Sequence, residues 1–259
     1  MGMTRLIVLG LFLLAPEVGD ELPGELAPFV PPGQEALDFE TGDLDGDGRT
    51  DAVLILAAPG EAEERDDMDA RRPLLLLIRQ ADGRLKQARR GDGVVYCRTC
   101  GGMMGDPYVG TEVARGRFTV THYGGSAWRW GNSFTFSYDR ARKDWFLDQE
   151  TSTSFHATEP DDSRDEVLTR EELGDVTLEA FRYEHDEAQP WRVIAPRARF
   201  YDQPKVASKP GKAYLVEGDV LEVYRELRHF VYGRFTNRAG DTTSGYLRKA
   251  DVSAVPAAP

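Results

Sequence analysis

The sequence predicts a mostly β protein that contains two β units, and three observations lead to this expectation. Glycine and proline are abundant, at 26 and 15 of the 259 residues, which favours short elements joined by frequent turns. Aromatic residues, 10% of the chain, fall in short runs of the kind found in strands. Residues 186–191 look like a linker, so we expect one β-rich domain over residues 20–185 and a second over residues 192–256.

The first element in the chain is a predicted signal peptide over residues 1–19. Arg5 supplies a positive charge, the next ten residues are almost wholly apolar, and Pro16 ends the run. Such a run is too short to span a bilayer but suits the core of a signal peptide. The cleavage site is not obvious, and the alternative is an ordinary N-terminal strand or helix. Export predicts a periplasmic or secreted protein.

The second element is an acidic loop, whose nine residues 43–51 read Asp-Leu-Asp-Gly-Asp-Gly-Arg-Thr-Asp. Carboxylates stand at loop positions 1, 3, 5 and 9, and glycine stands at position 6, where a sharp turn is needed. Calcium prefers six to eight oxygen ligands, which such a loop can supply from one short segment. The predicted ligands are the side chains of four residues and one backbone carbonyl: Asp43, Asp45, Asp47 and Asp51, and the carbonyl of Arg49. The alternative is a solvated acidic turn without an ion.

The residues after this loop distinguish it from an EF-hand. Position 12 would be Glu in an EF-hand but is Leu54 here. Leu54 lies in the apolar run 52–57, which predicts a buried strand rather than an exiting helix. Residues 42–54 therefore resemble a calcium loop of the FG-GAP/VCBS type, present here as a single copy. The resemblance implies that the loop lies between two β-strands and that calcium has a structural role.

Charge excludes some classes of partner. The formal net charge is −12 at neutral pH, whereas binding of nucleic acid requires clustered lysine and arginine. The same charge argues against an anionic membrane surface. After removal of the signal peptide, no stretch approaches the roughly 18 apolar residues of a membrane span.

The chain has two cysteines, Cys97 and Cys100, three residues apart. A local disulfide is the expectation for an exported protein. A zinc site needs four ligands, and the four histidines are scattered. A thioredoxin-like pair belongs at the start of a helix, but Gly101 and Gly102 follow immediately and disfavour one. Zinc, redox and nucleophilic functions for these cysteines remain alternatives.

The segment 117–147 predicts an antiparallel meander of three strands, at residues 117–123, 127–138 and 145–147. Within it, Trp128, Arg129 and Trp130 form a possible ligand shelf by cation–π stacking. The alternative is that one tryptophan packs in the core while Arg129 is exposed. The following residues 159–166 are charged and turn-prone, and the sequence does not decide between helix and strand over residues 151–190.

The C-terminal region predicts five short strands, at residues 198–201, 213–216, 220–224, 229–236 and 244–247. Its motifs are Tyr-x-x-Pro at 201–204, Leu-Val-x-Gly-Asp at 215–219 and Gly-Tyr-Leu at 245–247. These motifs make the region similar to bacterial SH3-like domains. The resemblance implies an SH3-like β-barrel that acts as a binding module, often attached to cell-wall enzymes.

Together these features predict an exported, non-catalytic binding protein of the bacterial cell envelope, stabilised by calcium, whose SH3-like module engages cell wall or an envelope protein. No nucleophile motif is visible, since Ser126 does not lie in a Gly-x-Ser-x-Gly sequence. One alternative is a cell-envelope hydrolase that uses Cys97 or an unrecognised pair of carboxylates, with the SH3-like domain as a targeting module. Another is an inhibitor or immunity protein whose acidic surface blocks a basic partner.

Overall fold

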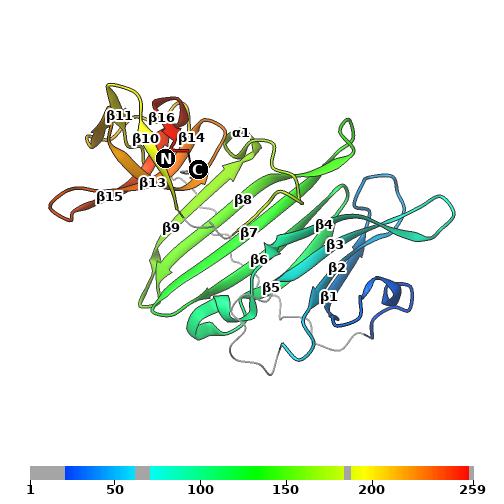
Figure 1. Cartoon of the computed structure of the whole chain (residues 1–259). Helices are drawn as coiled ribbons and strands as arrows, with labels where there is room; N and C mark the ends of the chain where they lie inside the picture. Colours follow the sequence, from blue (N-terminus) through cyan, green and yellow to red (C-terminus); the bar gives the residue numbers. More distant parts are fainter. Residues whose placement is uncertain (1–20, 62–70, 184–187, 257–259) are drawn as a thin grey trace, which may run out of the picture.

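The computed structural model describes residues 21–61, 71–183 and 188–256 (Figure 1), so the predicted signal peptide at 1–19 lies outside the described residues. The prediction of a mostly β protein is confirmed: the described residues form sixteen strands, one four-residue α-helix and three short 3₁₀ segments. The paired strands are antiparallel throughout the described residues. Close antiparallel pairing fits a chain with so many turn-forming residues.

The first sheet has four strands in the order β1-β2-β3-β4. Its strands are β1 (Glu35–Gly42), β2 (Asp51–Ala57), β3 (Arg72–Arg79) and β4 (Leu85–Val95). The predicted buried strand at 52–57 is confirmed as β2, all of which is buried. Both of its faces are covered, because one packs on the main core and the other on Leu26 and Phe29 of the segment that contains η1 (Ala27–Phe29). Burial on both faces explains why β2 reads as a continuous apolar run.

The second sheet is a five-stranded meander in sequence order. Its strands are β5 (Tyr108–Ala114), β6 (Arg117–Gly125), β7 (Trp128–Asp139), β8 (Asp144–His156) and β9 (Glu159–Thr169). The three predicted strands of the meander correspond to β6, β7 and β8. Phe118 and Val120 alternate with threonines along β6, and both phenylalanine and valine are buried in the main core.

The expectation of a turn at 159–166 is wrong, because these residues lie in β9. They pair with β8 in a register that sets Arg164 opposite Ser154 and Val167 opposite Thr151. The charge of this segment suits its place at the edge of the sheet, where charged side chains reach solvent. The short helix α1 (Arg170–Leu173) follows, capped by Thr169 and Glu172. Residues 151–173 are thus mainly strand.

The C-terminal unit contains the predicted strands and two more. The strands are β10 (Gln189–Val193), β11 (Arg197–Arg199), β12 (Tyr214–Val216), β13 (Val220–Glu226), β14 (Phe230–Thr236), β15 (Thr242–Arg248) and β16 (Val252–Ala254). A 3₁₀ turn, η3 (Lys249–Asp251), precedes β16. β10 begins within residues 186–191, the predicted linker, of which 186 and 187 lie outside the described part. Trp191 draws this segment into the unit, since its side chain is buried in the unit's own core.

These strands do not close into a barrel in the described structure. Five of them form an open sheet in the order β15-β14-β13-β10-β16, and β11 and β12 form a separate two-stranded sheet. β11 and β12 have three residues each, and the isolated bridge between Tyr201 and Tyr246 is the pairing seen between the two sheets. Strands of three residues form too few backbone hydrogen bonds to join the two sheets into a closed barrel. Apolar side chains from both sheets still share one core, which includes Phe200 and Leu221.

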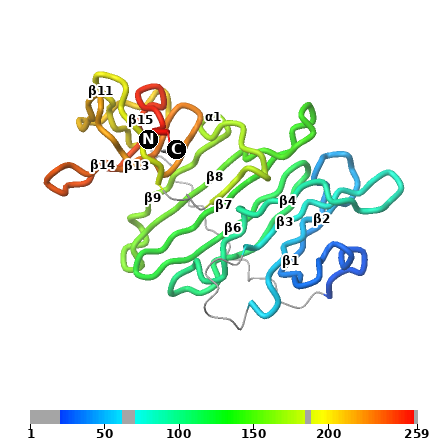
Figure 2. Tube along the Cα trace, viewed as in Figure 1, coloured from blue at the N-terminus to red at the C-terminus, as the bar shows by residue number. Residues whose placement is uncertain are grey.

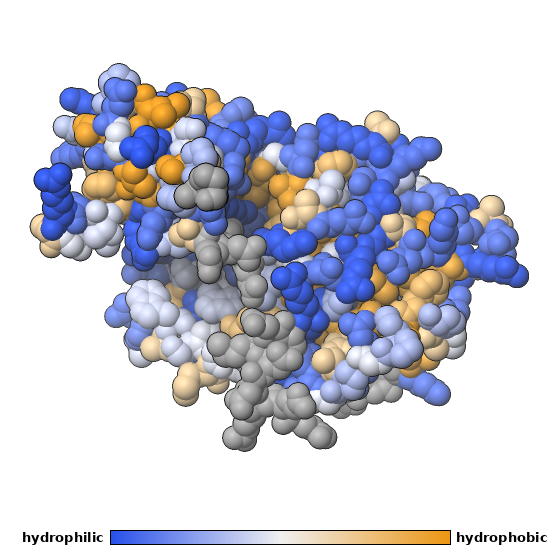
Figure 3. Space-filling model, viewed as in Figure 1, coloured by the Kyte–Doolittle hydropathy of each residue, from blue (hydrophilic) through white to orange (hydrophobic). Residues whose placement is uncertain are grey.

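The C-terminal unit lies on the β9 side of the second sheet (Figures 1 and 2). Leu227 and Phe230 of this unit pack into the main core, and Arg225 pairs with Glu150 of β8. The face drawn in Figure 3 is mostly hydrophilic, with apolar areas scattered among the charged ones, in keeping with a chain that is 29% charged residues. The two units therefore meet through both apolar and charged contacts.

Candidate metal centre

The acidic loop joins β1 to β2, so it lies between two strands. Gly46 and Gly48 have φ angles of +77° and +91°, a region that residues with a Cβ rarely adopt. Leu44, in the same loop, is fully buried in the main core, and its carbonyl accepts a 3.0 Å hydrogen bond from the indole Nε1 of Trp145. The loop is therefore a tight turn that is anchored in the protein interior, not a loop that extends freely into solvent.

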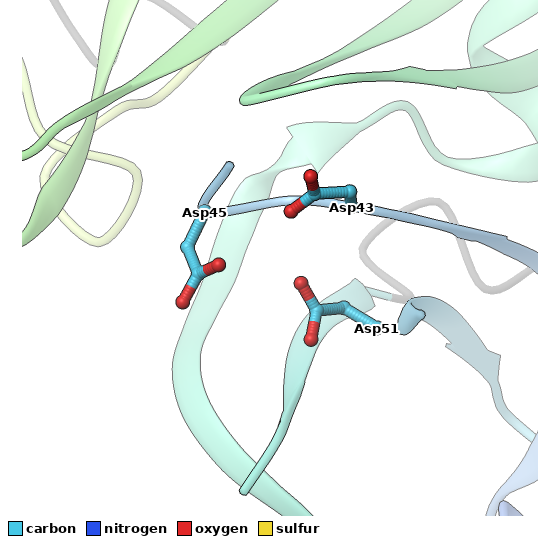
Figure 4. A group of neighbouring side chains, drawn as sticks. All are labelled: Asp43, Asp45 and Asp51. Atoms are coloured by element: carbon cyan, nitrogen blue, oxygen red, sulfur yellow. The ribbon is translucent and has the colours of Figure 1, made fainter. Parts of the chain in front are cut away.

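Three of the four predicted carboxylates lie together at this turn (Figure 4). One carboxylate oxygen from each of Asp43, Asp45 and Asp51 lies within 4.8 Å of the others. Asp43 directly follows β1, Asp51 opens β2, and Asp45 reaches the cluster from the loop between them. The pairing of β1 with β2 thus brings the two ends of the nonapeptide together.

Hydrogen bonds fix the carboxylate of Asp51 most firmly. Its Oδ2 accepts the backbone N–H of Leu44 at 2.8 Å, and its Oδ1 accepts the backbone N–H of Arg79 at 2.8 Å. The Oδ2 of Asp43 accepts the N–H of Gly48 at 3.0 Å. The Oδ1 of Asp43 is buried and accepts no hydrogen bond from the described residues. This oxygen is free to accept a cation.

Electrostatics penalise the cluster when it holds no cation. Burial, followed by repulsion from neighbouring aspartates, raises the pKa of Asp51 above its ordinary value, although two backbone N–H groups act in the opposite direction. Burial also raises the pKa of Asp45, and Asp47 and Asp43 add repulsion. Raised pKa values mean that these carboxylates lack full compensation for their charge. A bound cation would supply that compensation.

Asp47, the ligand predicted at position 5, does not belong to the cluster in this structure. Its carboxylate forms an ion pair with the guanidinium of Arg49 and accepts the backbone N–H of the same residue at 2.9 Å. The Nε of Arg49 in turn donates to the carbonyl of Arg79 at 2.8 Å. A rotation of the Asp47 side chain away from Arg49 is needed before it can contribute an oxygen to an ion.

Two further arginines hold the loop from the second sheet. Arg115 and Arg140 each donate to the carbonyl of Gly46, at 3.1 Å and 3.0 Å, and Arg115 approaches the Asp43 carboxylate to 3.3 Å. The backbone N–H of Gly116 donates to the carbonyl of Asp43 at 2.7 Å. The loop is thus one of the places at which the first sheet is tied to the second.

The donor set fits a hard cation. Carboxylate and carbonyl oxygens suit calcium and magnesium, and no histidine or cysteine contributes to the cluster that would favour zinc or copper. Calcium tolerates an irregular set of oxygens, whereas magnesium needs a strict octahedron and gives up its water reluctantly. A tight turn with three carboxylates, one of them fixed by two backbone groups, is the more compatible with calcium.

The two cysteines lie at disulfide distance, as the sequence predicts: the sulfur atoms of Cys97 and Cys100 are 2.11 Å apart. The following segment η2 (Arg98–Met104) is a 3₁₀ element interrupted at Gly102, where φ is +65°. The glycines therefore prevent a regular helix after the cysteines, which removes the setting that a thioredoxin-like pair requires.

The possible ligand shelf of Trp128, Arg129 and Trp130 does not form a stack of all three side chains. Trp130 is half-buried and packs on Tyr96, with ring centroids 5.6 Å apart, whereas Trp128 is 59% exposed. Arg129 points to the other face of the strand, and the cation–π contacts found among the described residues involve other arginines. The arrangement matches the alternative in which one tryptophan joins the core, although Arg129 itself is half-buried.

Two groups of polar residues were not anticipated from the sequence. The fully buried Arg72 binds Asp106 through two guanidinium nitrogens, at 2.7 Å and 2.6 Å, and Glu61 at 2.8 Å. The second group lines a hollow between β8–β9 and the C-terminal sheet. Both groups join residues more than ten positions apart in the chain, so no local pattern could reveal them.

Comparison with known proteins adds no relative: no family model matches the chain, and the searches of curated proteins and of solved structures give no match. No helix in the described ranges has the length and apolar character needed to cross a bilayer.

Proposed function

We propose that this chain is an exported, non-catalytic binding protein of the bacterial cell envelope. In this proposal, Asp43, Asp45 and Asp51, with Asp47 and the carbonyl of Arg49, hold a structural calcium ion in a loop of the FG-GAP/VCBS type. The C-terminal unit is an SH3-like module that engages cell wall or an envelope protein. The observation that carries the proposal is the cluster of three carboxylates within 4.8 Å of one another.

The position of the cluster supports a structural role for the ion. The same turn receives the indole of Trp145 and the backbone N–H of Gly116, both from the second sheet. An ion that fixes the turn would therefore also hold the two sheets in register. Extracellular modules typically have weak calcium sites, which fill only at millimolar concentrations of calcium. A weak site in this loop therefore agrees with the predicted export.

The chemistry of the described residues favours binding over catalysis. A nucleophilic cysteine must be a thiolate, and a cysteine in a disulfide has no thiolate. The pKa of His122, lowered by burial to about 3, leaves a neutral imidazole that is fully shielded from solvent and from any substrate. A hydrolase that uses Cys97 is therefore the weaker candidate.

A pull-down from cell-envelope extract tests the proposal. The mature chain is immobilised, and retained material is compared in 2 mM calcium and in chelator for three proteins: wild type, Asp45→Asn, and the matched control Asp82→Asn, which changes a carboxylate in the β3–β4 turn. We expect all three proteins to retain wall fragments or an envelope protein, and calcium to increase retention near the melting temperature less for Asp45→Asn than for wild type and the control. Turnover of cell-wall material by the purified chain would contradict a non-catalytic role.

A further inference from the structure

A cleft of about 630 Å³ lies between the second sheet and the C-terminal unit. On the side of the sheet it is lined by Ser152 and Ser154 of β8 and by Glu166 of β9. On the side of the C-terminal unit it is lined by Tyr232 of β14 and Tyr246 of β15. Clefts at the boundary between two units are frequent places for ligands, and this volume is in the range of known ligand sites. The cleft is therefore a candidate binding site, separate from the acidic loop.

The strand register places two tryptophans on the same face of the sheet as the serines of the cleft. Trp130 of β7 lies directly opposite Ser154, and Trp128 lies opposite His156. Residues directly opposite each other in an antiparallel pair share a face. The indole of Trp128 is 59% exposed and packs against the imidazole of His156, with ring centroids 5.3 Å apart. A flat apolar surface thus adjoins the hydroxyl groups of the cleft.

The charged groups inside the cleft are already partnered with one another. Arg225 of β13 donates to both carboxylate oxygens of Glu150 on β8, at 2.8 Å and 2.5 Å, and both side chains are largely buried. A bidentate pair of this kind uses the fork of the guanidinium on the carboxylate. The carboxylate of Glu166 accepts the hydroxyl of Tyr246 at 3.1 Å and is attracted by the charge of Lys205. These groups are therefore not offered to a charged ligand.

The charges at the rim of the cleft balance as well. Asp165 turns to the opposite face of the β8–β9 pair, where it accepts a hydrogen bond from the hydroxyl of Thr153. Asp202 and Arg164 remain at the rim, exposed and of opposite sign. The cleft and its surroundings thus contain three carboxylates and three cationic groups: Glu150, Glu166 and Asp202, and Arg164, Lys205 and Arg225. Electrostatics consequently favour neither an anionic nor a cationic ligand.

Neutral polar groups around the cleft keep free capacity for hydrogen bonds. Five such groups have no hydrogen-bond partner within the described residues: the hydroxyls of Ser152, Ser154 and Tyr232, and the indole N–H groups of Trp128 and Trp130. Each hydroxyl can donate one hydrogen bond and accept two, and each indole N–H can donate one. This unused capacity suits a ligand that carries many neutral hydroxyl or amide groups.

We propose that the cleft and the adjoining face of β7 bind an extended, neutral oligosaccharide. In this arrangement a sugar ring stacks its apolar C–H face on the indole of Trp128, and the sugar hydroxyls exchange hydrogen bonds with Ser154 and Tyr232. Trp130 follows on the same face, roughly 7 Å further along the strand, so the next ring of an extended chain meets a second indole. A neutral peptide is the weaker candidate, because β8 is paired on both sides and cannot accept a further strand.

The inference rests on the proposed binding function and deepens it, since it names one ligand class in place of cell wall or an envelope protein. It also assigns part of the contact surface to the second sheet, outside the SH3-like module. The pull-down tests whether envelope material is retained at all, whereas a titration with defined ligands tests this ligand class. The two failures are therefore distinguishable.

The test is a titration of the mature chain followed by NMR, with four probes. Two are the neutral sugars chitotetraose and cellotetraose, the third is the anionic sugar tetragalacturonate, and the fourth is the neutral peptide N-acetyl-tetraserine amide. Trp128→Ala removes the exposed indole, and Ser154→Ala removes one free hydroxyl of the cleft. Tyr123→Ala is the matched control, because Tyr123 is an exposed aromatic residue opposite Gly131, on the other face of the same sheet.

We expect one or both neutral sugars to bind, with an affinity that changes by less than about twofold between low and high salt, since no net charge is recognised. Trp128→Ala should weaken binding about tenfold and Ser154→Ala about threefold, while Tyr123→Ala leaves it unchanged. Absence of binding by both neutral sugars, tighter binding of tetragalacturonate or of the peptide, or equal effects of Trp128→Ala and Tyr123→Ala would overturn the inference. Retention of envelope material in the pull-down would stand in each of these cases.

Discussion

Replacement of Asp45 by Asn is the sharpest test of the calcium proposal. Asp45 contributes one of the three clustered carboxylates, but its hydrogen bond within the described residues is a local one, from the backbone N–H of Asp47 at 3.1 Å. Asp51, in contrast, ties the loop to Arg79 and cannot be changed without disturbing the fold. Asparagine keeps the size of the side chain and an oxygen acceptor. The substitution therefore removes a charge from the cluster, and it weakens the ligand without abolishing it, because an amide oxygen can also bind calcium.

The expected magnitude follows from the geometry of the cluster. Two charges 4.8 Å apart, the largest separation within the cluster, repel by about 3.5 kcal/mol at an effective dielectric constant of about 20. Solvent reduces this value at Asp45, which is half-buried, so we expect Asp45→Asn to stabilise the ion-free protein by about 1 kcal/mol. A calcium site with a Kd of ~1 mM adds about 1.4 kcal/mol at 10 mM calcium, or about 3 to 5 °C in melting temperature.

The assay is thermal unfolding by circular dichroism in chelator, in 10 mM calcium and in 10 mM magnesium. Wild type should gain stability in calcium and less in magnesium, whereas Asp45→Asn should melt higher than wild type in chelator and gain less than wild type from calcium. Asp82→Asn, in the β3–β4 turn, should behave as wild type. Identical wild-type curves in calcium and in chelator, or a full calcium shift in Asp45→Asn, would refute the reasoning.

Three further predictions concern other parts of the chain. Burial, reinforced by the charge of Arg72, lowers the pKa of His122 to about 3, whereas the same histidine has a pKa near 6.5 in the unfolded chain. Because only the unfolded chain gains this proton between pH 7 and pH 5, the free energy of unfolding should fall by about 2 kcal/mol over that range. His122→Gln should flatten the pH dependence of urea unfolding relative to wild type, and an unchanged dependence would contradict the assignment. A fragment of residues 188–256 should fold alone. A fragment of residues 192–256 should be less stable by about 3 to 5 kcal/mol, because it lacks the buried Trp191. A random-coil spectrum from the longer fragment would show that the C-terminal unit depends on the first two sheets for its fold. Protein from an oxidising compartment should yield no alkylated thiol before reduction, since Cys97 and Cys100 lie at disulfide distance, and two modified cysteines would oppose this prediction.

The local pattern of apolar residues was sufficient to predict the strands that are buried on one or both faces. The run 52–57 is apolar because β2 is covered on both faces, and the alternation in 117–138 reflects strands with one face in the core. The turn residues Gly46 and Gly48 need positive φ angles, so the motif itself encoded the shape of the loop. The acidic cluster was also predictable, because its members lie within nine residues of one another.

Features that depend on distant pairing were not predictable in the same way. β9 is charged along most of its length and has no apolar alternation until Leu168, so only its pairing with β8 makes it a strand. Likewise, Glu150 and Arg225 are distant in sequence and come together because the C-terminal unit packs against the middle of β8. The open arrangement of the C-terminal strands depends on the shortness of β11 and β12, which the motifs of an SH3-like domain do not specify.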